Sequence, residues 1–149
     1  TTGAPTACEA AGVPCVGYNI SMIPTAPNTA LTSASIDWEP YYEYATKCII
    51  DGTAIDTDWC KGFAEGADKL TDLNDKVVAE GTAEKVKEVE DAIIDGRLHV
   101  FDTSTFTVDG KELTDADSEY VSDGYFHESE KASAPAFDFI IDGITAVTQ

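Results

Sequence analysis

Short apolar runs that alternate with glycine-terminated helical patterns constrain the fold of this chain most strongly. Residues 13–18 form a mostly apolar run rich in β-formers, and they follow Gly12, the residue type expected just past a helix end. Residues 31–36 show the alternation of a second strand. We therefore expect residues 13–18 to form a buried strand of a mainly parallel sheet, preceded by a short helix at residues 6–11.

Two amphipathic helices are expected after these strands. Asp37 can cap the first helix, Pro40 suits its first turn and Gly52 ends it. The second helix is expected to run from an N-cap at Thr82 to Gly96. One face of the first helix carries, at spacings of three and four, the residues Tyr41, Tyr44, Ala45, Cys48 and Ile49. Strands that alternate with such helices indicate an α/β fold.

Three further segments complete the expected architecture. Residues 98–101 have the pattern of another strand, and residues 61–73 have room for a short one. The dipeptide Asp109-Gly110 is a strong signal for a two-residue hairpin turn, so a β-excursion is expected there. Residues 114–122 are polar and acidic, and we expect an exposed loop.

The charge of the chain argues against several classes of function. Its 149 residues include 28 Asp and Glu against 9 Lys and Arg, which gives a formal net charge of −19. Nucleic-acid and anionic-membrane binding depend on clustered cations, so neither is expected. A calcium loop is not expected either, because the acidic run that begins at Asp115 has Tyr120 and Phe126 where an EF-hand requires glycine and glutamate.

The sequence contains no recognisable enzyme motif. It lacks a nucleophile elbow, a phosphate-binding loop, a dinucleotide fingerprint and an H-E-x-x-H helix, and His99 and His127 are not spaced as a metal pair. The group Asp123, His127 and Glu130 looks most like a site, but on so acidic a segment a solvated surface is the better interpretation. We therefore expect no enzymatic activity, no catalytic residue, no cofactor and no metal.

The best candidate for a binding site lies where the first strand ends and the first long helix begins. Ligands of open α/β sheets bind outside the carboxyl ends of the strands. An amide, a hydroxyl, a carboxylate and a large ring suit a small polar molecule with a flat part. The pattern equally allows Asn19 to make a turn, Asp37 to cap the helix and Trp38 to fill the core. The candidate ligand-binding residues are Asn19, Ser21, Met22, Asp37 and Trp38.

Four segments, in this order, resemble a known family over about residues 7–102. They are Val16-Gly17-Tyr18-Asn19-Ile20-Ser21-Met22, residues 31–42 with the helix that ends in Asp51-Gly52, residues 61–67, and residues 86–101. This series is similar to the C-terminal part of the basic membrane protein family. That family comprises the substrate-binding lipoproteins of ABC importers and includes receptors of the purine nucleoside type.

The resemblance implies a portion of a two-lobed type I periplasmic-binding fold, with ligand clamped between the lobes. Residues 1–36 would supply the last strands of one lobe and a hinge crossing, residues 37–102 would complete the lobes, and residues 103–149 would form a β-hairpin and an acidic extension. Asn19 stands where the family usually has an aspartate for ribose hydroxyls. Asp37 lies close to the place where nucleoside binders tend to have a lysine.

The resemblance also implies a function. It predicts a monomeric, extracytoplasmic receptor that delivers a small polar, nucleoside-like solute to an ABC permease, within a parent protein that is lipid-anchored to the membrane. The alternative is a stand-alone sensory or regulatory module that uses the same cleft. The chain begins at Thr1 without an initiator Met, as a processed chain or a fragment would.

Four cysteines, Cys8, Cys15, Cys48 and Cys60, allow three pairings, and they match no zinc spacing. In an extracytoplasmic protein the local pairs Cys8 with Cys15 and Cys48 with Cys60 are plausible staples, whereas in a cytosolic protein buried thiols are the rule. The location that the resemblance implies favours disulfides. We predict a bond between Cys48 and Cys60, which lie on either side of the helix end at Gly52.

Overall fold

The computed structural model describes residues 2–127 and 139–145. The chain divides into two compact units, one of residues 1–55 and 61–94 and the other of residues 56–60 and 95–149. Glu130 and the other residues of 128–138 and 146–149 in the predicted C-terminal region lie outside the described residues. Within the residues that the structure describes, no helix has both the length and the hydrophobicity that crossing a membrane requires.

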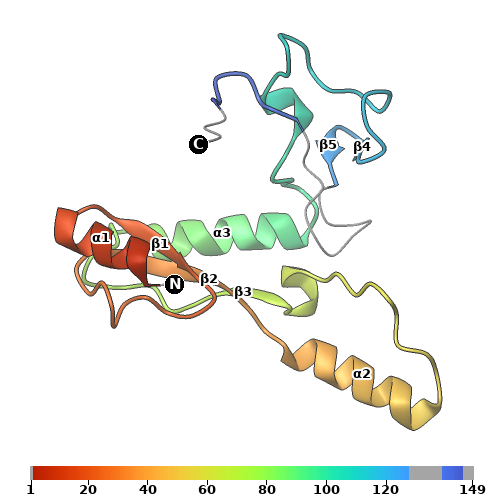
Figure 1. Cartoon of the computed structure of the whole chain (residues 1–149), viewed down its shortest axis with the longest axis horizontal. Helices are drawn as coiled ribbons and strands as arrows, with labels where there is room; N and C mark the ends of the chain where they lie inside the picture. Colours follow the sequence, from red (N-terminus) through yellow and green to blue (C-terminus); the bar gives the residue numbers. More distant parts are fainter. Residues whose placement is uncertain (1, 128–138, 146–149) are drawn as a thin grey trace. The chain divides into compact units, whose positions relative to one another are not determined.

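The first unit combines helices with one small sheet (Figure 1). Its elements are α1 (Gly3–Ala11), β1 (Cys15–Tyr18), β2 (Ala30–Ile36), α2 (Glu39–Asp51), the 3-10 helix η1 (Phe63–Glu65), β3 (Asp68–Leu70) and α3 (Thr82–Ile94). The strand order is β1-β2-β3, with β1 parallel to β2 and β3 antiparallel to β2. The predicted mixture of helices and strands is confirmed, but the sheet is mixed rather than mainly parallel.

The strand expected at residues 13–18 forms as β1, but it is not buried on both faces. Val16 and Tyr18 are 59% and 67% exposed, whereas Cys15 and Gly17 on the other face are half-buried. Within the described residues, the burial of Cys15 and Gly17 shows that only their face of β1 is covered. The core on that side is formed by Met22, Ala26 and Ala30, with Cys15 and Ile23 packed against it.

The helix ends follow the local chemistry of the sequence. Gly12 and Gly52 end α1 and α2 in the left-handed conformation, each with a φ of 67°, which glycine adopts at no steric cost. The N-cap position of α2 is Trp38 rather than Asp37, but the carboxylate of Asp37 still accepts a hydrogen bond from the backbone N–H of Glu39, the first helical residue, at 3.0 Å. Thr82 differs from expectation, because it is the first helical residue of α3 rather than the residue before it.

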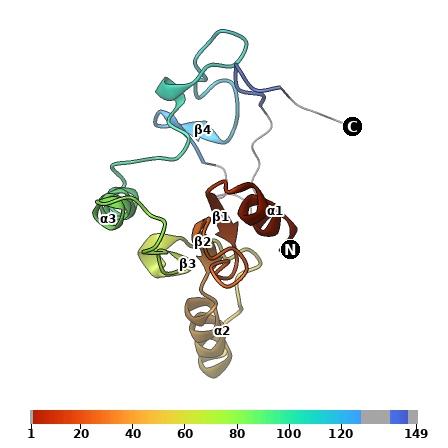
Figure 2. The same ribbon diagram turned by 90° about the vertical axis from the view of Figure 1, so that its left-hand side faces the viewer.

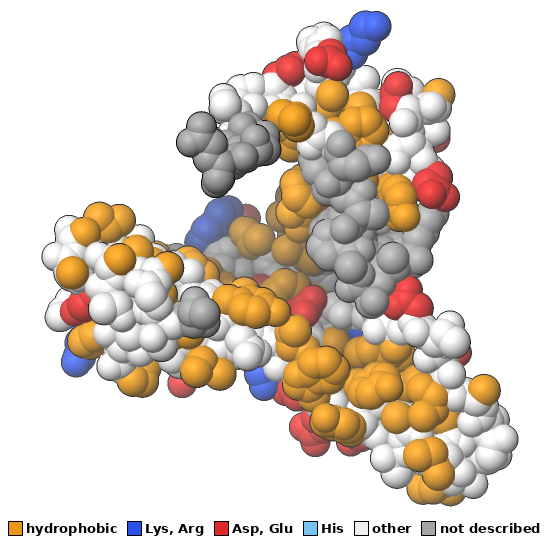
Figure 3. Space-filling model, in the orientation of Figure 1, with side chains coloured by type: hydrophobic (Ala, Val, Ile, Leu, Met, Phe, Trp, Pro, Cys, Tyr) orange, Lys and Arg blue, Asp and Glu red, His pale blue; other side chains and the backbone are white. Residues whose placement is uncertain are grey.

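The helix α2 stands off the sheet in both views (Figure 1, Figure 2). Its expected inner face is confirmed in part, since Cys48 is buried and Tyr41, Tyr44 and Ala45 are half-buried. Ile49 was expected on the same face but is 73% exposed. Hydrophobic side chains therefore gather on the surface over α2 (Figure 3).

A buried asparagine joins the segment after β3 to the start of β2. The side-chain amide of Asn74 donates to the carbonyl oxygens of Ala30 at 2.8 Å and Pro27 at 3.1 Å, and its backbone N–H donates to Leu31 at 2.8 Å. Burial is tolerated here because the amide hydrogens have acceptors. This contact holds the loop before β2 against the sheet.

The second unit has its own small core of Leu113, Val121 and Phe126. Its elements are η2 (Thr103–Thr105), β4 (Val121–Ser122) and β5 (Tyr125–Phe126), and β4 pairs with β5 in an antiparallel hairpin. The predicted turn at Asp109-Gly110 is confirmed, because Val108 and Lys111 pair across it with hydrogen bonds of 2.8 and 3.1 Å.

One expectation for the second unit was wrong and another is met only in part. Residues 98–101 do not form a strand. They belong to the second unit, whereas the described three-stranded sheet belongs to the first. Leu98 and Val100 are exposed, and Phe101 packs with the small core. The acidic stretch of residues 114–122 is mostly exposed as expected, but it ends in β4, where Val121 is buried.

The predicted disulfide between Cys48 and Cys60 is not formed in the structure. All four cysteines lie within the described residues, and none takes part in a disulfide. Cys48 is buried on α2 in the first unit, whereas Cys60 is exposed and belongs to the segment of the second unit at residues 56–60.

Candidate functional site

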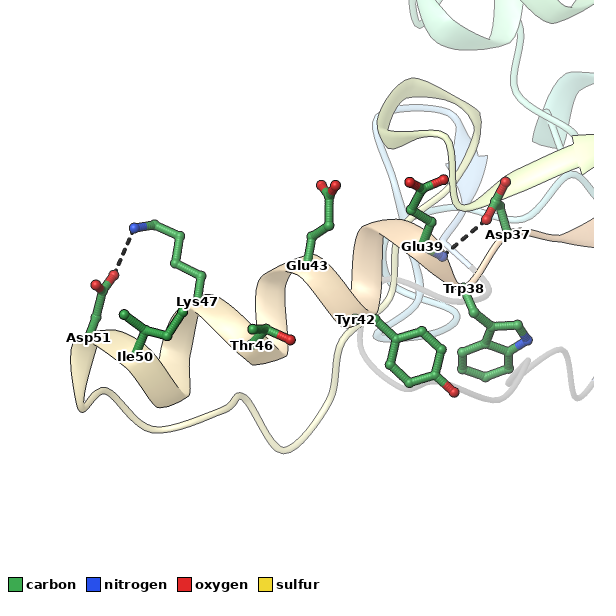
Figure 4. A pocket seen from close by; sticks show the side chains of 9 residues that line it. All are labelled: Asp37, Trp38, Glu39, Tyr42, Glu43, Thr46, Lys47, Ile50 and Asp51. Atoms are coloured by element: carbon green, nitrogen blue, oxygen red, sulfur yellow. Dashed lines mark hydrogen bonds and ion pairs between the residues drawn. The ribbon is translucent and has the colours of Figure 1, made fainter.

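An open groove with a volume of about 780 Å³ runs along α2 at the predicted site (Figure 4). It begins at the residue after β2 and follows the helix to its last residue. The groove is lined by Asp37, Trp38, Glu39, Tyr42, Glu43, Thr46, Lys47, Ile50 and Asp51. Two of the five predicted ligand-binding residues, Asp37 and Trp38, therefore lie in it.

Two aromatic rings stand at one edge of this groove. Trp38 and Tyr42 are 55% and 64% exposed, their ring centroids are 6.5 Å apart, and the rings are tilted by 40°. Tyr41 meets the indole edge-on at 6.3 Å and so helps to fix its orientation. The alternative that Trp38 fills the core is wrong. Its ring has surface available for stacking on a flat ligand.

Carboxylates dominate the charge of the groove. Figure 4 shows Trp38 and Tyr42 pointing to one side of α2 and the carboxylates of Glu39 and Glu43 projecting from the other side. Lys47 is the lysine among the lining residues, and its ammonium pairs with Asp51 at 2.7 Å. Four lining carboxylates against one lysine repel a phosphate group, whereas they accept hydrogen bonds from hydroxyl and N–H donors.

Asp37 has two structural roles at the start of the groove. One oxygen accepts from the N–H of Glu39, and the other lies 2.6 Å from the ammonium nitrogen of Lys69 on β3. The hydrogen bond from Lys69, followed by the bond from Glu39 and the charge of Lys69, lowers the pKa of Asp37 below its usual value. The carboxylate therefore stays ionised while it orders the helix start.

Lys69 is the functional candidate that the sequence pattern did not reveal. It borders two further hollows of about 540 and 390 Å³ and also reaches Asp37 at the groove along α2. The smaller hollow contains Asp68, whose pKa is raised by burial. In the sequence, Lys69 is one lysine within residues 61–73, a segment with room for a short strand. That pattern gave no indication that Asp37 is its partner.

The remaining predicted residues are not brought to the groove. Ser21 lines the hollow of about 540 Å³ instead. Met22 is 5% exposed, packs in the core and does not line the groove. The run of residues after β1 turns inward at this point, because Gly17 leaves space that the Met22 side chain fills.

Asn19 makes the turn that its position allowed. It adopts a left-handed φ of 74°, its N–H donates to Ala34 at 2.6 Å, and its carbonyl accepts from the Ser35 hydroxyl at 2.6 Å. Strands β1 and β2, which lie on either side of Asn19 in the sequence, pair in parallel. Asn19 is not among the residues that line the groove with Trp38, so the two do not share this hollow.

Metal binding finds no support in the part of the chain that is described. Residues 2–127 and 139–145 contain no group of three or more His, Cys, Asp or Glu side chains that could hold an ion.

Comparison with known proteins gives one informative similarity. The chain is 30% identical over 101 residues to a purine-binding protein of Brucella abortus (strain 2308). This match covers 68% of the chain but 28% of that protein, so the chain spans less than a third of its relative's length. No family model matches the chain. The similarity is consistent with a purine- or nucleoside-binding protein.

Proposed function

We propose that this chain is part of an extracytoplasmic purine nucleoside receptor and that the α2 groove forms one wall of its ligand site. The observation that carries the proposal is the exposed pair Trp38 and Tyr42 beside carboxylates in one groove. The similarity to a purine-binding protein supports the same ligand class.

The chemistry of the groove suits a nucleoside better than a nucleotide. A purine base offers a flat face to Trp38 and Tyr42 on one side of α2, while the carboxylates of Glu39 and Glu43 on the other side add negative charge to the groove. A phosphate would meet four carboxylates and a lysine that is already paired with Asp51. The groove volume of about 780 Å³ lies within the range of small-molecule sites.

The groove is built from one helix and its preceding residues, so it cannot enclose a ligand alone. Small-molecule sites cover most of the ligand surface. We propose that a longer parent protein supplies the opposite wall, in keeping with the relative's greater length. In that parent, the complete receptor binds its solute without chemical change and delivers it to an ABC permease as a lipid-anchored monomer.

Isothermal titration of the full-length gene product with adenosine, adenosine 5′-monophosphate and ribose tests this function. We expect adenosine to bind more tightly than the other two ligands. Trp38→Ala should weaken adenosine binding by more than about tenfold, because stacking on the base is lost, with little change in melting temperature.

The matched control is Ile49→Ala, which removes an exposed apolar side chain of the same helix that does not line the groove. It should leave adenosine affinity unchanged. Equal affinity for adenosine and its monophosphate would contradict the proposal. A Trp38→Ala variant with a much lower melting temperature and the same adenosine affinity as the unmutated protein would contradict it as well.

A further inference from the structure

Cys8 and Cys15 lie on either side of the turn that joins α1 to β1. Cys8 is in the last part of α1, Cys15 is the first residue of β1, and both are half-buried. Gly12 reverses the chain between them, and the N–H of Val13 donates to the carbonyl oxygen of Cys8 at 3.0 Å. The turn therefore returns the chain toward the cysteine at the helix end.

A second set of contacts fastens both sides of this turn to one buried residue, Thr29. The N–H of Cys15 donates to the carbonyl oxygen of Thr29 at 2.9 Å. The carboxylate of Glu9, the neighbour of Cys8, accepts from the Thr29 hydroxyl at 2.9 Å and from the N–H of Asn28 at 3.1 Å. The backbone at each cysteine is thus held by hydrogen bonds that do not involve the thiols.

The two thiols also contact each other. Burial, the charge of Cys8 and a hydrogen bond between the two sulfur groups raise the pKa of the Cys15 thiol. The α1 helix lies beside β1 in both ribbon views (Figure 1, Figure 2).

We propose that Cys8 and Cys15 are the cysteines of this chain that close into a disulfide, which fastens α1 to β1. With oxidised glutathione as the oxidant, one cysteine thiolate attacks the glutathione disulfide and releases one reduced glutathione. The second cysteine thiolate then attacks the protein sulfur of the mixed disulfide and releases the other. Two protein thiols are oxidised and one glutathione disulfide is reduced, and the two leaving glutathione thiolates take up the two protons that the protein thiols lose.

This inference is independent of the proposed ligand and replaces the pairing of Cys48 with Cys60. Cys48 is buried on α2, and Cys60 lies in the segment that belongs to the second unit. Cys8 and Cys15 lie within one unit and on either side of one turn, and this arrangement favours a disulfide between them. The short loop between them also keeps the entropy cost of closure small.

Trypsin separates the two candidate pairs, which makes the test direct. Cleavage after Lys47 and Lys61 places Cys8 and Cys15 in the peptide of residues 1–47, and Cys48 and Cys60 in the peptide of residues 48–61. The reduced full chain is incubated with oxidised glutathione, alkylated with iodoacetamide, digested and weighed by mass spectrometry. We expect the first peptide to lose two thiol hydrogens and resist alkylation, while the second peptide is alkylated at both cysteines.

The opposite pattern, with residues 48–61 oxidised and residues 1–47 alkylated twice, would overturn the inference. Stable glutathione adducts on both Cys8 and Cys15 would overturn it as well. Cys15→Ser should stop at a single glutathione adduct on Cys8, whereas the double variant Cys48→Ser and Cys60→Ser should oxidise as the parent does. Glu9→Ala should slow closure severalfold, because it releases the hydrogen bonds that hold the end of α1 to Thr29.

Discussion

The ammonium nitrogen of Lys69 lies 2.6 Å from the carboxylate of Asp37, and this contact joins β3 to the start of α2. Because the second oxygen of Asp37 accepts from the N–H of Glu39, one side chain both binds the first N–H of the helix and ties the helix to the sheet. Trp38 is the next residue, so the ring proposed to stack on ligand is positioned by the same ion pair.

Acid should weaken this junction. The pKa of Asp37 is lowered in the folded chain, first by the hydrogen bond from Lys69, so the unfolded carboxyl binds a proton more readily. The contribution to stability is complete above the pKa of the unfolded carboxyl, and it is lost as pH falls through the lower pKa of the folded state. Urea unfolding from neutral to about pH 3 should show a shallower acid loss for Asp37→Asn than for the parent.

Lys69→Met gives an independent check of the same contact. It should raise the pKa of Asp37, measured by carboxyl carbon shifts in NMR titration, because its first hydrogen-bond donor is removed. Lys47→Met is the control, since it breaks the exposed pair of Lys47 with Asp51 and leaves the environment of Asp37 unchanged. An Asp37 titration that is the same in all three proteins would exclude the assigned role of Lys69.

Features set by a few consecutive residues could be predicted from the sequence. The helix ends at Gly12 and Gly52 and the turn at Asp109-Gly110 all form where expected, because backbone chirality restricts these positions locally. The hydrogen bond from the N–H of Glu39 to Asp37 belongs to the same class, since it joins groups two residues apart, although the N-cap position itself is Trp38. The alternation of strands and helices also follows from local periodicity.

Features set by partners distant in the sequence could not be predicted. Residues 98–101 have the sequence pattern of a strand. Whether they pair with other strands in a sheet depends on distant segments, which the local sequence does not specify. The contact of Lys69 with Asp37 depends on β3 pairing antiparallel with β2, which nothing in either segment specifies. The exposure of Trp38 was likewise left open by pattern alone, because it depends on how far α2 stands from the sheet.

The closeness of β1 and β2 at Gly17 leads to a second prediction. A Cβ atom added at Gly17 would lie nearer than 3.0 Å to the hydroxyl of Ser33 and to the side chain of Met22. Gly17→Ala should therefore destabilise the first unit by about 1–3 kcal/mol through overpacking. Gly3→Ala is the matched control, because a Cβ at Gly3 meets nothing within 4 Å.

Ser33→Ala should partly rescue the Gly17→Ala variant. The Ser33 hydroxyl is fully buried and makes no hydrogen bond within the described residues, so its removal relieves both the crowding and an unsatisfied polar group. Alone, Ser33→Ala should be neutral or stabilising by up to about 1 kcal/mol in urea unfolding. If the two changes are simply additive, the proposed contact between Gly17 and Ser33 is not the cause of the strain.

The last prediction concerns Asp142, which closes the turn at Asp109-Gly110 in the second unit. Its carboxylate accepts from the hydroxyl of Thr107 at 2.5 Å and from the N–H groups of Asp109 and Gly110 at 3.1 and 2.8 Å. The hydrogen bond from Thr107, followed by the bond from Gly110, lowers the pKa of Asp142 in the folded chain. The ionised form is therefore the one that holds the turn.

Asp142→Asn should loosen this turn, because an amide has one acceptor oxygen in place of two and carries no charge. We expect the hydrogen-exchange protection of the Gly110 amide to fall by roughly three- to tenfold at neutral pH, with little change in the first unit. In the parent, the same loss of protection should appear as pH falls through the pKa of Asp142. Asp115→Asn, in the exposed acidic stretch, is the control for a change of charge alone. Equal protection of Gly110 in the parent and both variants would show that Asp142 does not hold the turn.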